Sequence, residues 1–457
     1  MKTAILLFGL GLSGLVIYSC HKTQPFTKDQ LDERMSGGDC TAFDESSGAY
    51  GNLIPGLSER DEQFHDVGDK FFETSFIPSG GQANGLGPLY HQVSCARCHV
   101  NEGRGLPPLG GVPTESFFLR LSMPGEDAHG APLNVPGFGS QLQDRAVNGF
   151  QPEGLVDVSY FETDEFLADG TKVSLRKPTY TIINPYTSLP AGMLMSPRMA
   201  RPNFGMGLIE AISDASLLKN EDPMDANGDG VSGRANRVYD YLINQANAIG
   251  RIGWKAAVPN IKNQAAKALL EDIGITTSVF AKSNAVGQPQ AKGDVEAELH
   301  DSILNSLTFY MQTLAVPARR KVDDPVVKQG QKVFAQSGCI KCHVDLHETN
   351  VNVAFKPLSA QLIRPYSDFL LHDMGAGLAD GRPEFKASGS EWRTPPLWGI
   401  GLSERVNGHT NYLHDGRART FSEAVMWHSG EAQSAKNNFK NLSTAERETL
   451  LKFLGSL

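Results

Sequence analysis

The stretch SCARCHV at residues 94–100, which recurs in kind as GCIKCHV at residues 338–344, decides what this chain can fold around. Both stretches contain Cys-x-x-Cys-His, and together they use four of the 6 cysteines in a chain of 457 residues. Two thiols and an imidazole that occur together twice predict two sites of the same chemistry. The residues of these sites are Cys95, Cys98 and His99 in the first copy and Cys339, Cys342 and His343 in the second.

Cys-x-x-Cys pairs occur in several kinds of site. In an oxidising compartment they form disulfides or redox-active dithiols, and they also bind zinc. Here both pairs run directly into histidine, which is the attachment signature of c-type haem. The cysteines form thioethers with the haem, and the imidazole becomes the proximal iron ligand. We therefore expect two covalent haems with His99 and His343 as proximal ligands, which leaves Cys40 without an assigned role.

The composition is that of a globular protein with a sizeable core, because 40% of the residues are hydrophobic and 20% are charged. The formal net charge of -9 and the lack of a basic tract exclude a nucleic-acid partner. The chain also contains 47 glycines and 26 prolines. We therefore expect long stretches of ordered loops and turns.

The first residues have the pattern of an export signal. Lys2 precedes a mostly apolar, uncharged run at residues 4–18, which is too short to span a bilayer comfortably. Ile17 and Ser19 stand three and one positions before Cys20, as in a bacterial lipobox. The expectation is that residues 1–20 are a lipoprotein signal peptide and that Cys20 is lipidated, with plain secretion as the alternative.

Residues 21–50 are polar and rich in Gly and Ser, which is typical of a flexible tether. A multiply acylated cysteine would hold the protein on a membrane stably. No later segment has enough unbroken apolar residues to span a bilayer. We therefore expect an exported, periplasm-facing bacterial lipoprotein, on the outer membrane, whose contact with the membrane is the lipid alone.

The two motifs divide the remaining chain into an expected N-terminal haem lobe, residues 51–320, and an expected C-terminal cytochrome c-like haem lobe, residues 321–457. Residues of about 112–190 alternate apolar and polar side chains between glycines and prolines, which predicts a β-rich insertion of short strands in the first lobe. The predicted fold class is mainly α, with two cytochrome c-like haem lobes of which the first carries this β-rich, loop-rich insertion.

Helical patterns mark the ends of both expected lobes. Residues 62–76 predict a leading helix, residues 205–273 predict further helices, and residues 294–317 predict an amphipathic helix stopped by Pro317. The last helix follows Ser443, which forms a capping box with Glu446.

Residues 391–432 resemble the C-terminal haem domain of the bacterial di-haem cytochrome c peroxidase superfamily, through a RTPPL turn, an HDG motif and a following helix. In that superfamily the distal methionine of the electron-transfer haem lies fourteen residues after the HDG histidine. Counting from His414 reaches His428 here. The resemblance implies a bis-histidine haem ligated by His343 and His428, which moves electrons and binds nothing else.

Other side chains compete for these roles. His372 and Met374 are the alternative ligands to His428, whereas His414 is expected to pack or hydrogen-bond near the haem. The resemblance also implies a tryptophan between the two haems. Trp254 is the best-placed candidate, a purely packing role is its alternative, and Trp392 and Trp398 are nearer the second motif in sequence.

Further stretches, among them SPRMARPNFGMGLIEAI, GRIGWKAA and RPYSDFLLHDMGAGLADG, resemble the di-haem oxidoreductase family of peroxidase-like proteins from about residue 51 to residue 457. The resemblance implies an enzyme that takes electrons from a small redox protein or cytochrome and passes them from the C-terminal haem to peroxide or another small oxidant at the N-terminal haem. The alternatives are a non-catalytic electron-transfer cytochrome, such as a redox partner in metal uptake, and an oxidase of an organic or protein substrate.

Peroxide cleavage at the N-terminal haem needs an acid/base and a stabilising cation on the distal side. Glu210, at the polar end of an apolar segment, is the predicted acid/base, and Arg198 is the predicted cation. A helix-surface carboxylate and a haem propionate partner are their respective alternatives. His65 and His91 are alternative distal groups.

The stretch DANGDGVSGRAN at residues 225–236 matches the first half of an EF-hand calcium loop. The glutamate at the twelfth position is absent, since Asn236 stands there. The alternative to a calcium site is an Asx-rich turn that satisfies its own backbone. The predicted calcium ligands are Asp225, Asn227, Asp229 and the carbonyl of Val231, after Gly230 at the tight turn.

Overall fold

The computed structural model describes residues 32–78, 85–285, 287–289 and 298–457. The expected signal segment with its lipidation site Cys20, and the first part of the expected tether, lie outside these ranges. Within them, no helix combines the length and apolar character that crossing a bilayer requires. The residues Glu33–Leu457 belong to one unit, and the division into two lobes at residue 320 stays a prediction.

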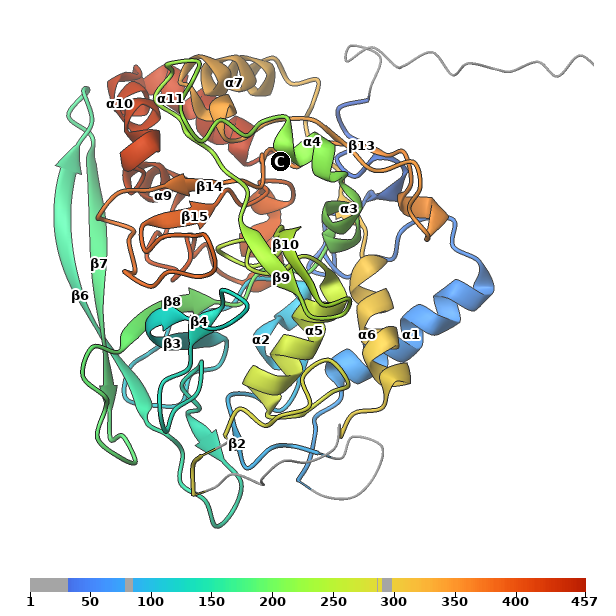
Figure 1. Ribbon diagram of the computed structural model, residues 1–457. Helices are drawn as coiled ribbons and strands as arrows, with labels where there is room; N and C mark the ends of the chain where they lie inside the picture. The colour runs from blue at the N-terminus through green and yellow to red at the C-terminus, as the bar shows by residue number, and fades with distance from the viewer. Residues whose placement is uncertain (1–31, 79–84, 286, 290–297) are drawn as a thin grey trace, which may run out of the picture. The chain divides into compact units, whose positions relative to one another are not determined.

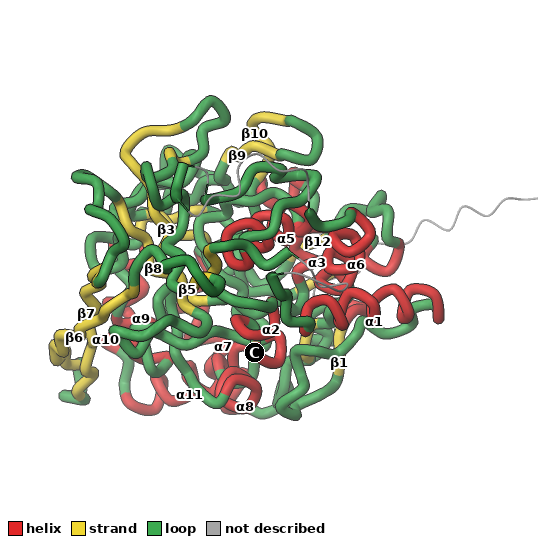
Figure 2. The backbone as a smooth tube through the Cα atoms, turned by 90° about the horizontal axis from the view of Figure 1, so that it is seen from below, coloured by secondary structure: helices red, strands yellow, loops and turns green. Residues whose placement is uncertain are grey.

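The described residues form eleven α-helices joined by long loops, and Figure 2 shows how much of the path is loop. The bounds of the helices are α1 Glu59–Glu73, α2 Cys95–Cys98, α3 Met206–Ala211, α4 Asp214–Leu218, α5 Ile261–Ala268, α6 Asp301–Gln312, α7 Pro325–Gln336, α8 Ser403–Asn407, α9 Phe421–Met426, α10 Gln433–Asn441 and α11 Thr444–Leu454.

Fifteen strands in the same residues form seven small sheets. One sheet has three strands in the order β4-β3-β8, and the others pair β1 with β11, β2 with β5, β6 with β7, β9 with β10, β12 with β13 and β14 with β15. The bounds of the strands are β1 Thr41–Ala42, β2 Leu89–Tyr90, β3 Phe117–Glu126, β4 Pro132–Leu133, β5 Arg145–Ala146, β6 Leu155–Phe166, β7 Lys172–Ile183, β8 Leu194–Met199, β9 Arg237–Asp240, β10 Gln245–Ile249, β11 Val316–Pro317, β12 His347–Glu348, β13 Leu362–Ile363, β14 Leu371–Asp373 and β15 Glu391–Arg393.

The predicted mainly α fold class is wrong, because the structure is 28% helix and 20% strand. Strands β3 to β7 lie in the stretch 112–190, where alternation favours them. The helices expected over 205–273 are interrupted by the hairpin of β9 and β10. In β9, buried Val238 and Asp240 alternate with half-buried neighbours, which is the period of a strand and not of a helix.

Several individual helices were predicted correctly. The capping box of Ser443 and Glu446 is confirmed at the start of α11. The leading helix is α1, and the amphipathic helix is α6, which ends at Gln312 and therefore before Pro317. Part of that last prediction, at residues 294–297, lies outside the described residues.

Helices α1 and α6 lie side by side and support the first Cys-x-x-Cys-His turn (Figure 1). They approach closely at Gly68, where a Cβ atom would overlap the carbonyl oxygen of Ser306 and the side chain of Tyr310. One turn further along α1, the ring of Phe72 lies 5.1 Å from that of Tyr310 and 6.1 Å from the imidazole of His99. The approach of the two backbones thus holds an aromatic ring against the first motif.

Helices α7 and α11 repeat this arrangement at the second turn. A Cβ atom at Gly330 would overlap the carbonyl oxygen of Thr449 and the side chain of Phe453. Four residues later, the ring of Phe334 lies 5.1 Å from that of Phe453 and 6.2 Å from the imidazole of His343. The two motifs therefore have matching supports, a glycine approach followed by phenylalanine one turn on.

We expect the variant Gly330→Ala to lower the free energy of unfolding by about 1–3 kcal/mol, because the added methyl group overpacks the α7–α11 contact. Chemical denaturation measures this loss. Gly48→Ala is the matched control, since the nearest atom to its Cβ is Ser46 Oγ at 3.6 Å, and its effect should stay within about 0.5 kcal/mol. Equal stability of the two variants would contradict the close packing described here.

The long β6–β7 hairpin runs beside the C-terminal helices (Figure 1). Glu165 of β6 pairs with Lys436 at 3.1 Å and with Lys440 at 3.2 Å, both on α10. Glu162 pairs with Arg419 at 2.8 Å, just before α9. These ion pairs connect the β6–β7 hairpin, from the first half of the sequence, to α10 and the start of α9 near the second motif.

Candidate functional site

Both Cys-x-x-Cys-His motifs fold as a single tight turn. In each, the backbone N–H of the histidine donates to the carbonyl of the first cysteine, at 3.0 Å from His99 to Cys95 and at 3.0 Å from His343 to Cys339. Side chains three positions apart in such a turn share one face. Each turn therefore presents two thiols together, with an imidazole at its end.

Three imidazoles share one hydrogen-bond arrangement. Their Nδ1 atoms face backbone carbonyls, which only accept hydrogen bonds, so Nδ1 carries the proton and Nε2 keeps its lone pair. Burial lowers the pKa of all three, that of His343 to about 4. They are therefore neutral near pH 7, as iron ligands must be. The bonds run from His99 to Arg201 O at 2.7 Å, from His343 to Tyr366 O at 2.9 Å and from His428 to Ala424 O at 2.7 Å.

The four motif cysteines are free thiols that form no disulfide. Burial raises the pKa of Cys95 and of Cys339 to about 12, and it also raises those of Cys98 and Cys342. A redox-active dithiol needs the opposite, a lowered thiol pKa. This environment disfavours the dithiol alternative, and a pair of thiols beside a neutral imidazole fits c-type haem attachment.

A first cavity is lined by Cys95, Cys98 and His99. Its wall also contains seven arginine and lysine side chains but only two carboxylates, Asp272 and Glu384. The excess of positive charge suits a ligand that carries carboxylates, and haem carries two propionates. The donor chemistry of this cavity therefore fits a haem.

Glu210, the predicted acid/base, does not line this cavity. Its carboxylate accepts hydrogen bonds from the backbone N–H of Ile261 at 2.8 Å and from Gln312 Nε2 at 2.6 Å. Ile261 is the first residue of α5, and a helix N-terminus attracts negative charge. The structure thus places Glu210 outside the first cavity, where its carboxylate joins α3, α5 and α6 and burial raises its pKa, and its acid/base role stays a prediction.

His65 and His91, the alternative distal groups, do not line the first cavity either. His65 Nδ1 bonds to Thr313 Oγ1 at 2.7 Å, and His91 Nδ1 lies 3.2 Å from Asp144 Oδ1. Both rings are buried among packed elements. The structure therefore places both imidazoles outside the first cavity.

Arg198, the predicted cation, does line the first cavity and is ion-paired with Glu384 at 2.5 Å. Glu384 is a functional candidate that the sequence reasoning missed. Although burial alone would raise its pKa, the charges of Arg198, Arg382 and other neighbouring cations hold the pKa of Glu384 well below its usual range. The cavity thus contains an ionised carboxylate beside a guanidinium.

A second cavity is lined by Cys339, Cys342, His343 and His428. Burial is the main cause that lowers the pKa of His343, and the neighbouring His428 is a smaller cause in the same direction. The structure therefore brings together the two imidazoles expected to ligate the second haem. This cavity also fits a haem through its thiol and imidazole donors.

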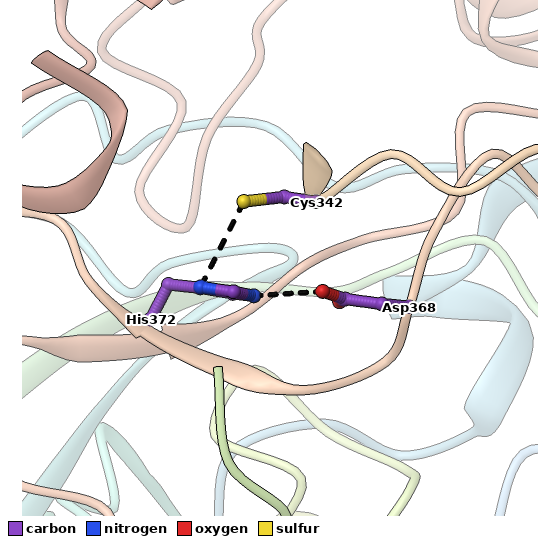
Figure 3. A group of neighbouring side chains, drawn as sticks. All are labelled: Cys342, Asp368 and His372. Carbon is purple, nitrogen blue, oxygen red and sulfur yellow. Dashed lines mark hydrogen bonds and ion pairs between the residues drawn. The ribbon is translucent and has the colours of Figure 1, made fainter. Parts of the chain in front are cut away.

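His372, one alternative ligand, lies beside Cys342 and Asp368 in a group compact enough to hold a metal ion (Figure 3). Its Nε2 pairs with Asp368 at 2.8 Å and its Nδ1 with Glu431 at 2.7 Å. These carboxylates overcome the effect of burial and raise the pKa of His372 well above its usual value. Because both nitrogens of a protonated imidazole are donors, His372 has no lone pair for iron.

Two other predicted neighbours also line the second cavity. Met374 packs with Trp254 and Trp392 in an apolar cluster. His414 stacks on Trp392 with ring centroids 4.0 Å apart, and its Nδ1 donates to Pro197 O at 2.9 Å. His414 therefore packs at this site, as the sequence suggests.

Trp254 lines both cavities, whereas Trp392 lines only the second and Trp398 only the first. The indole N–H of Trp254 donates to Met199 O at 2.9 Å, which fixes the ring in the wall between the cavities. Of the three tryptophans considered, Trp254 is thus the one in contact with both sites.

The predicted calcium loop satisfies its own backbone. Asp225 Oδ1 accepts from the N–H groups of Asp229 and Gly230, at 2.9 and 3.1 Å, and Asn227 Oδ1 also accepts from Asp229 at 2.9 Å. Asp229 in turn pairs with Lys341 of the second motif at 3.3 Å. These contacts match the alternative of an Asx-rich turn, and calcium binding, including its Val231 carbonyl ligand, stays a prediction.

Comparisons with known proteins add a family. A family model described as "Di-haem oxidoreductase, putative peroxidase" matches residues 30–457. No curated protein matches the chain significantly. Among solved structures, hydrazine synthase of Kuenenia stuttgartiensis, pressurised with 20 bar xenon, matches with 20% identity, a TM-score of 0.24 and coverage of 36% of this chain and 58% of that one. A similarity at this TM-score carries no argument.

Proposed function

The chain belongs to the di-haem oxidoreductase family, and from this premise we propose that it is a c-type cytochrome enzyme that reduces peroxide. One haem is attached at each Cys-x-x-Cys-His turn, through Cys95 and Cys98 and through Cys339 and Cys342. Each haem, when bound, supplies an iron that carries one electron at a time. The remaining steps belong to side chains of this chain.

The observation that carries the proposal is the difference between the two cavities. Among the described residues, the wall of the first cavity includes one histidine, His99, and the ion pair of Arg198 with Glu384. The wall of the second cavity includes His343 and His428, both neutral and both with Nε2 available. With His343 and His428 both as ligands, an iron at the second site would have no open position, so that site would transfer electrons and the first site would bind the substrate.

Electrons arrive at the second site from a small redox protein or cytochrome and cross the wall that contains Trp254. At the first site, the Arg198 guanidinium stabilises negative charge on peroxide. Glu384, whose carboxylate lies beside Arg198 in the wall of this cavity, accepts a proton from one peroxide oxygen and returns it to the other. Two electrons and two protons in total convert peroxide to two waters.

The location of the protein is part of the proposal. Attachment of c-type haem fits the exported lipoprotein expected from Cys20, which would face the periplasm from the outer membrane. Calcium at residues 225–231 would be a structural addition and takes no part in the steps above.

Spectra of the purified ferric protein test the function. We expect a low-spin bis-histidine signal together with a high-spin signal, and only the high-spin signal should change when peroxide is added. Consumption of peroxide by the reduced protein should accompany that change. Two low-spin haems that ignore peroxide would instead support a non-catalytic electron-transfer cytochrome.

The variant His428→Ala should convert the low-spin component to high spin, because it removes one of two strong-field ligands. Optical spectra at fixed haem content measure the conversion. His372→Gln is the matched control, since both nitrogens of His372 are committed to carboxylates, and it should keep the low-spin component. An unchanged spectrum in His428→Ala would remove His428 as a ligand.

A further inference from the structure

The wall between the two cavities contains three guanidinium groups that lack a carboxylate partner. Resting on the proposed pair of haems, we propose that Arg104, Arg201 and Arg393 form a clamp that binds the propionate carboxylates of both haems and raises their electron affinity. We call these three residues the arginine clamp.

Two members of the clamp meet at one backbone carbonyl. Gly253 O accepts hydrogen bonds from Arg201 Nη1 at 2.7 Å and from Arg393 Nε at 3.0 Å. The guanidinium of Arg201 also lies over the ring of Trp254, with its central carbon 5.0 Å from the ring centroid. Two positive charges are therefore held together beside the tryptophan that separates the cavities.

Arg104 completes the group. Its guanidinium lies over the ring of Tyr412, 5.5 Å from the centroid. Burial lowers the pKa of Arg201 to about 9, and the nearby positive charge of Arg104 contributes to this shift. The two guanidinium groups are therefore close enough to repel each other. Arg393 is buried and Arg104 and Arg201 are half-buried, so these three like charges repel one another and have lost part of their hydration, which is costly without a counter-charge.

Some N–H donors of the arginine clamp have no hydrogen-bond partner. Arg393 is only 2% exposed, and its Nη1 has no hydrogen-bond partner, as is also true of Arg104 Nε. Throughout the described part of the chain, no carboxylate lies within ion-pair distance of any of the three. Buried donors of this kind in native proteins are usually satisfied by a ligand or by water.

Other buried cations of the first cavity are paired, which sets the clamp apart. The pairs are Arg198 with Glu384, Arg120 with Glu271 and Arg251 with Asp214. The alternative role considered for Arg198, a propionate partner, is therefore better filled by the clamp. Guanidinium binds carboxylates through parallel N–H donors, so propionates are a fitting counter-charge.

The positions of the three residues distinguish the two haems. Arg201 lines the first cavity alone, whereas Arg104 and Arg393 line both. Arg201 is also linked to the first haem through its backbone, because its carbonyl accepts the Nδ1 proton of His99. A side-chain substitution at Arg201 leaves that carbonyl in place.

Spectroelectrochemical titration of the holoprotein tests the clamp. Removing a positive charge favours ferric over ferrous iron, so Arg201→Gln should lower the potential of the N-terminal haem alone, and Arg393→Gln should lower both. We expect about a tenfold change in the ferric-to-ferrous ratio at a fixed potential, which corresponds to about 59 mV for a one-electron couple. Arg201→Lys keeps the charge and should keep the potential close to that of the unaltered protein.

Arg319→Gln is the matched control, because Arg319 is buried and paired with Glu33 and lines neither cavity. Unmoved potentials in Arg201→Gln and Arg393→Gln at full haem content would overturn the clamp, as would an equal shift in Arg319→Gln. If Arg201→Gln fails to acquire its haems but Arg201→Lys acquires them, the result supports a requirement for positive charge at position 201. A haem-free unaltered protein would instead contradict the proposed function itself.

Discussion

Replacing Cys339 and Cys342 together by alanine should remove one of two covalent haems and abolish peroxide turnover. The two thiols are the only covalent attachment that the second turn offers, and without that haem electrons have no path to the first site. His343 and His428 would remain, but coordination by imidazoles alone does not hold a haem through denaturation. Haem staining of the denatured protein and intact mass measure the loss, with turnover measured on the same preparation.

Cys40→Ala provides the control for this loss. Cys40 is a free thiol, 2% exposed, whose Sγ lies 3.4 Å from Pro357 O. It lies outside both motifs and lines neither cavity. This variant should keep both haems. A double variant that still carried two covalent haems would contradict attachment at the second turn.

Glu384→Gln should slow peroxide reduction by about 10²-fold or more, the usual loss when a positioned acid/base is removed. The amide keeps the shape of the side chain but cannot accept a proton. Because Arg198 and its neighbours would lose their counter-charge, thermal stability and haem content are measured alongside the rate. Glu384→Asp keeps the charge but displaces the carboxylate. Its rate of peroxide reduction should lie between the rates of Glu384→Gln and the unaltered protein.

Glu210→Gln is the matched control for Glu384→Gln. Both carboxylates are hydrogen-bonded, Glu384 buried and Glu210 half-buried, but only Glu384 lines the first cavity. Turnover should persist in Glu210→Gln after correction for haem content. Rates that fall in Glu210→Gln and hold in Glu384→Gln would return the acid/base role to Glu210.

The parts of this account that sequence could predict are local. The Cys-x-x-Cys-His turns close on hydrogen bonds within the motif, from His99 to Cys95 and from His343 to Cys339. The capping box of Ser443 and Glu446 is equally local, and it is confirmed. Such features need no knowledge of distant segments.

What sequence could not supply depends on contacts between distant segments. The Glu210 carboxylate lies outside the first cavity because it bonds to Ile261 and Gln312. Glu384 lies in the wall of that cavity, paired with Arg198, which stands 186 positions earlier. No local pattern marks either contact. Arg201 and Arg393, by contrast, stand in the motifs SPRMARP and EWRTPPL, and their position there was a signal that could have been used.

The fold class failed for a related reason. A short strand is stabilised by its partner, and β3 pairs with β8 from Phe117 opposite Met199 to Ser122 opposite Leu194, across a long excursion of chain. Apolar runs of this length do not by themselves separate helix from strand. The mainly α prediction therefore missed the many two-stranded sheets.

The central claim is that two haems are bound covalently, one at each Cys-x-x-Cys-His turn. Intact mass of the denatured protein, matured in a host able to attach c-type haem, tests it most directly. The account predicts the mass of the polypeptide plus two haems. A polypeptide without added haem mass would contradict it.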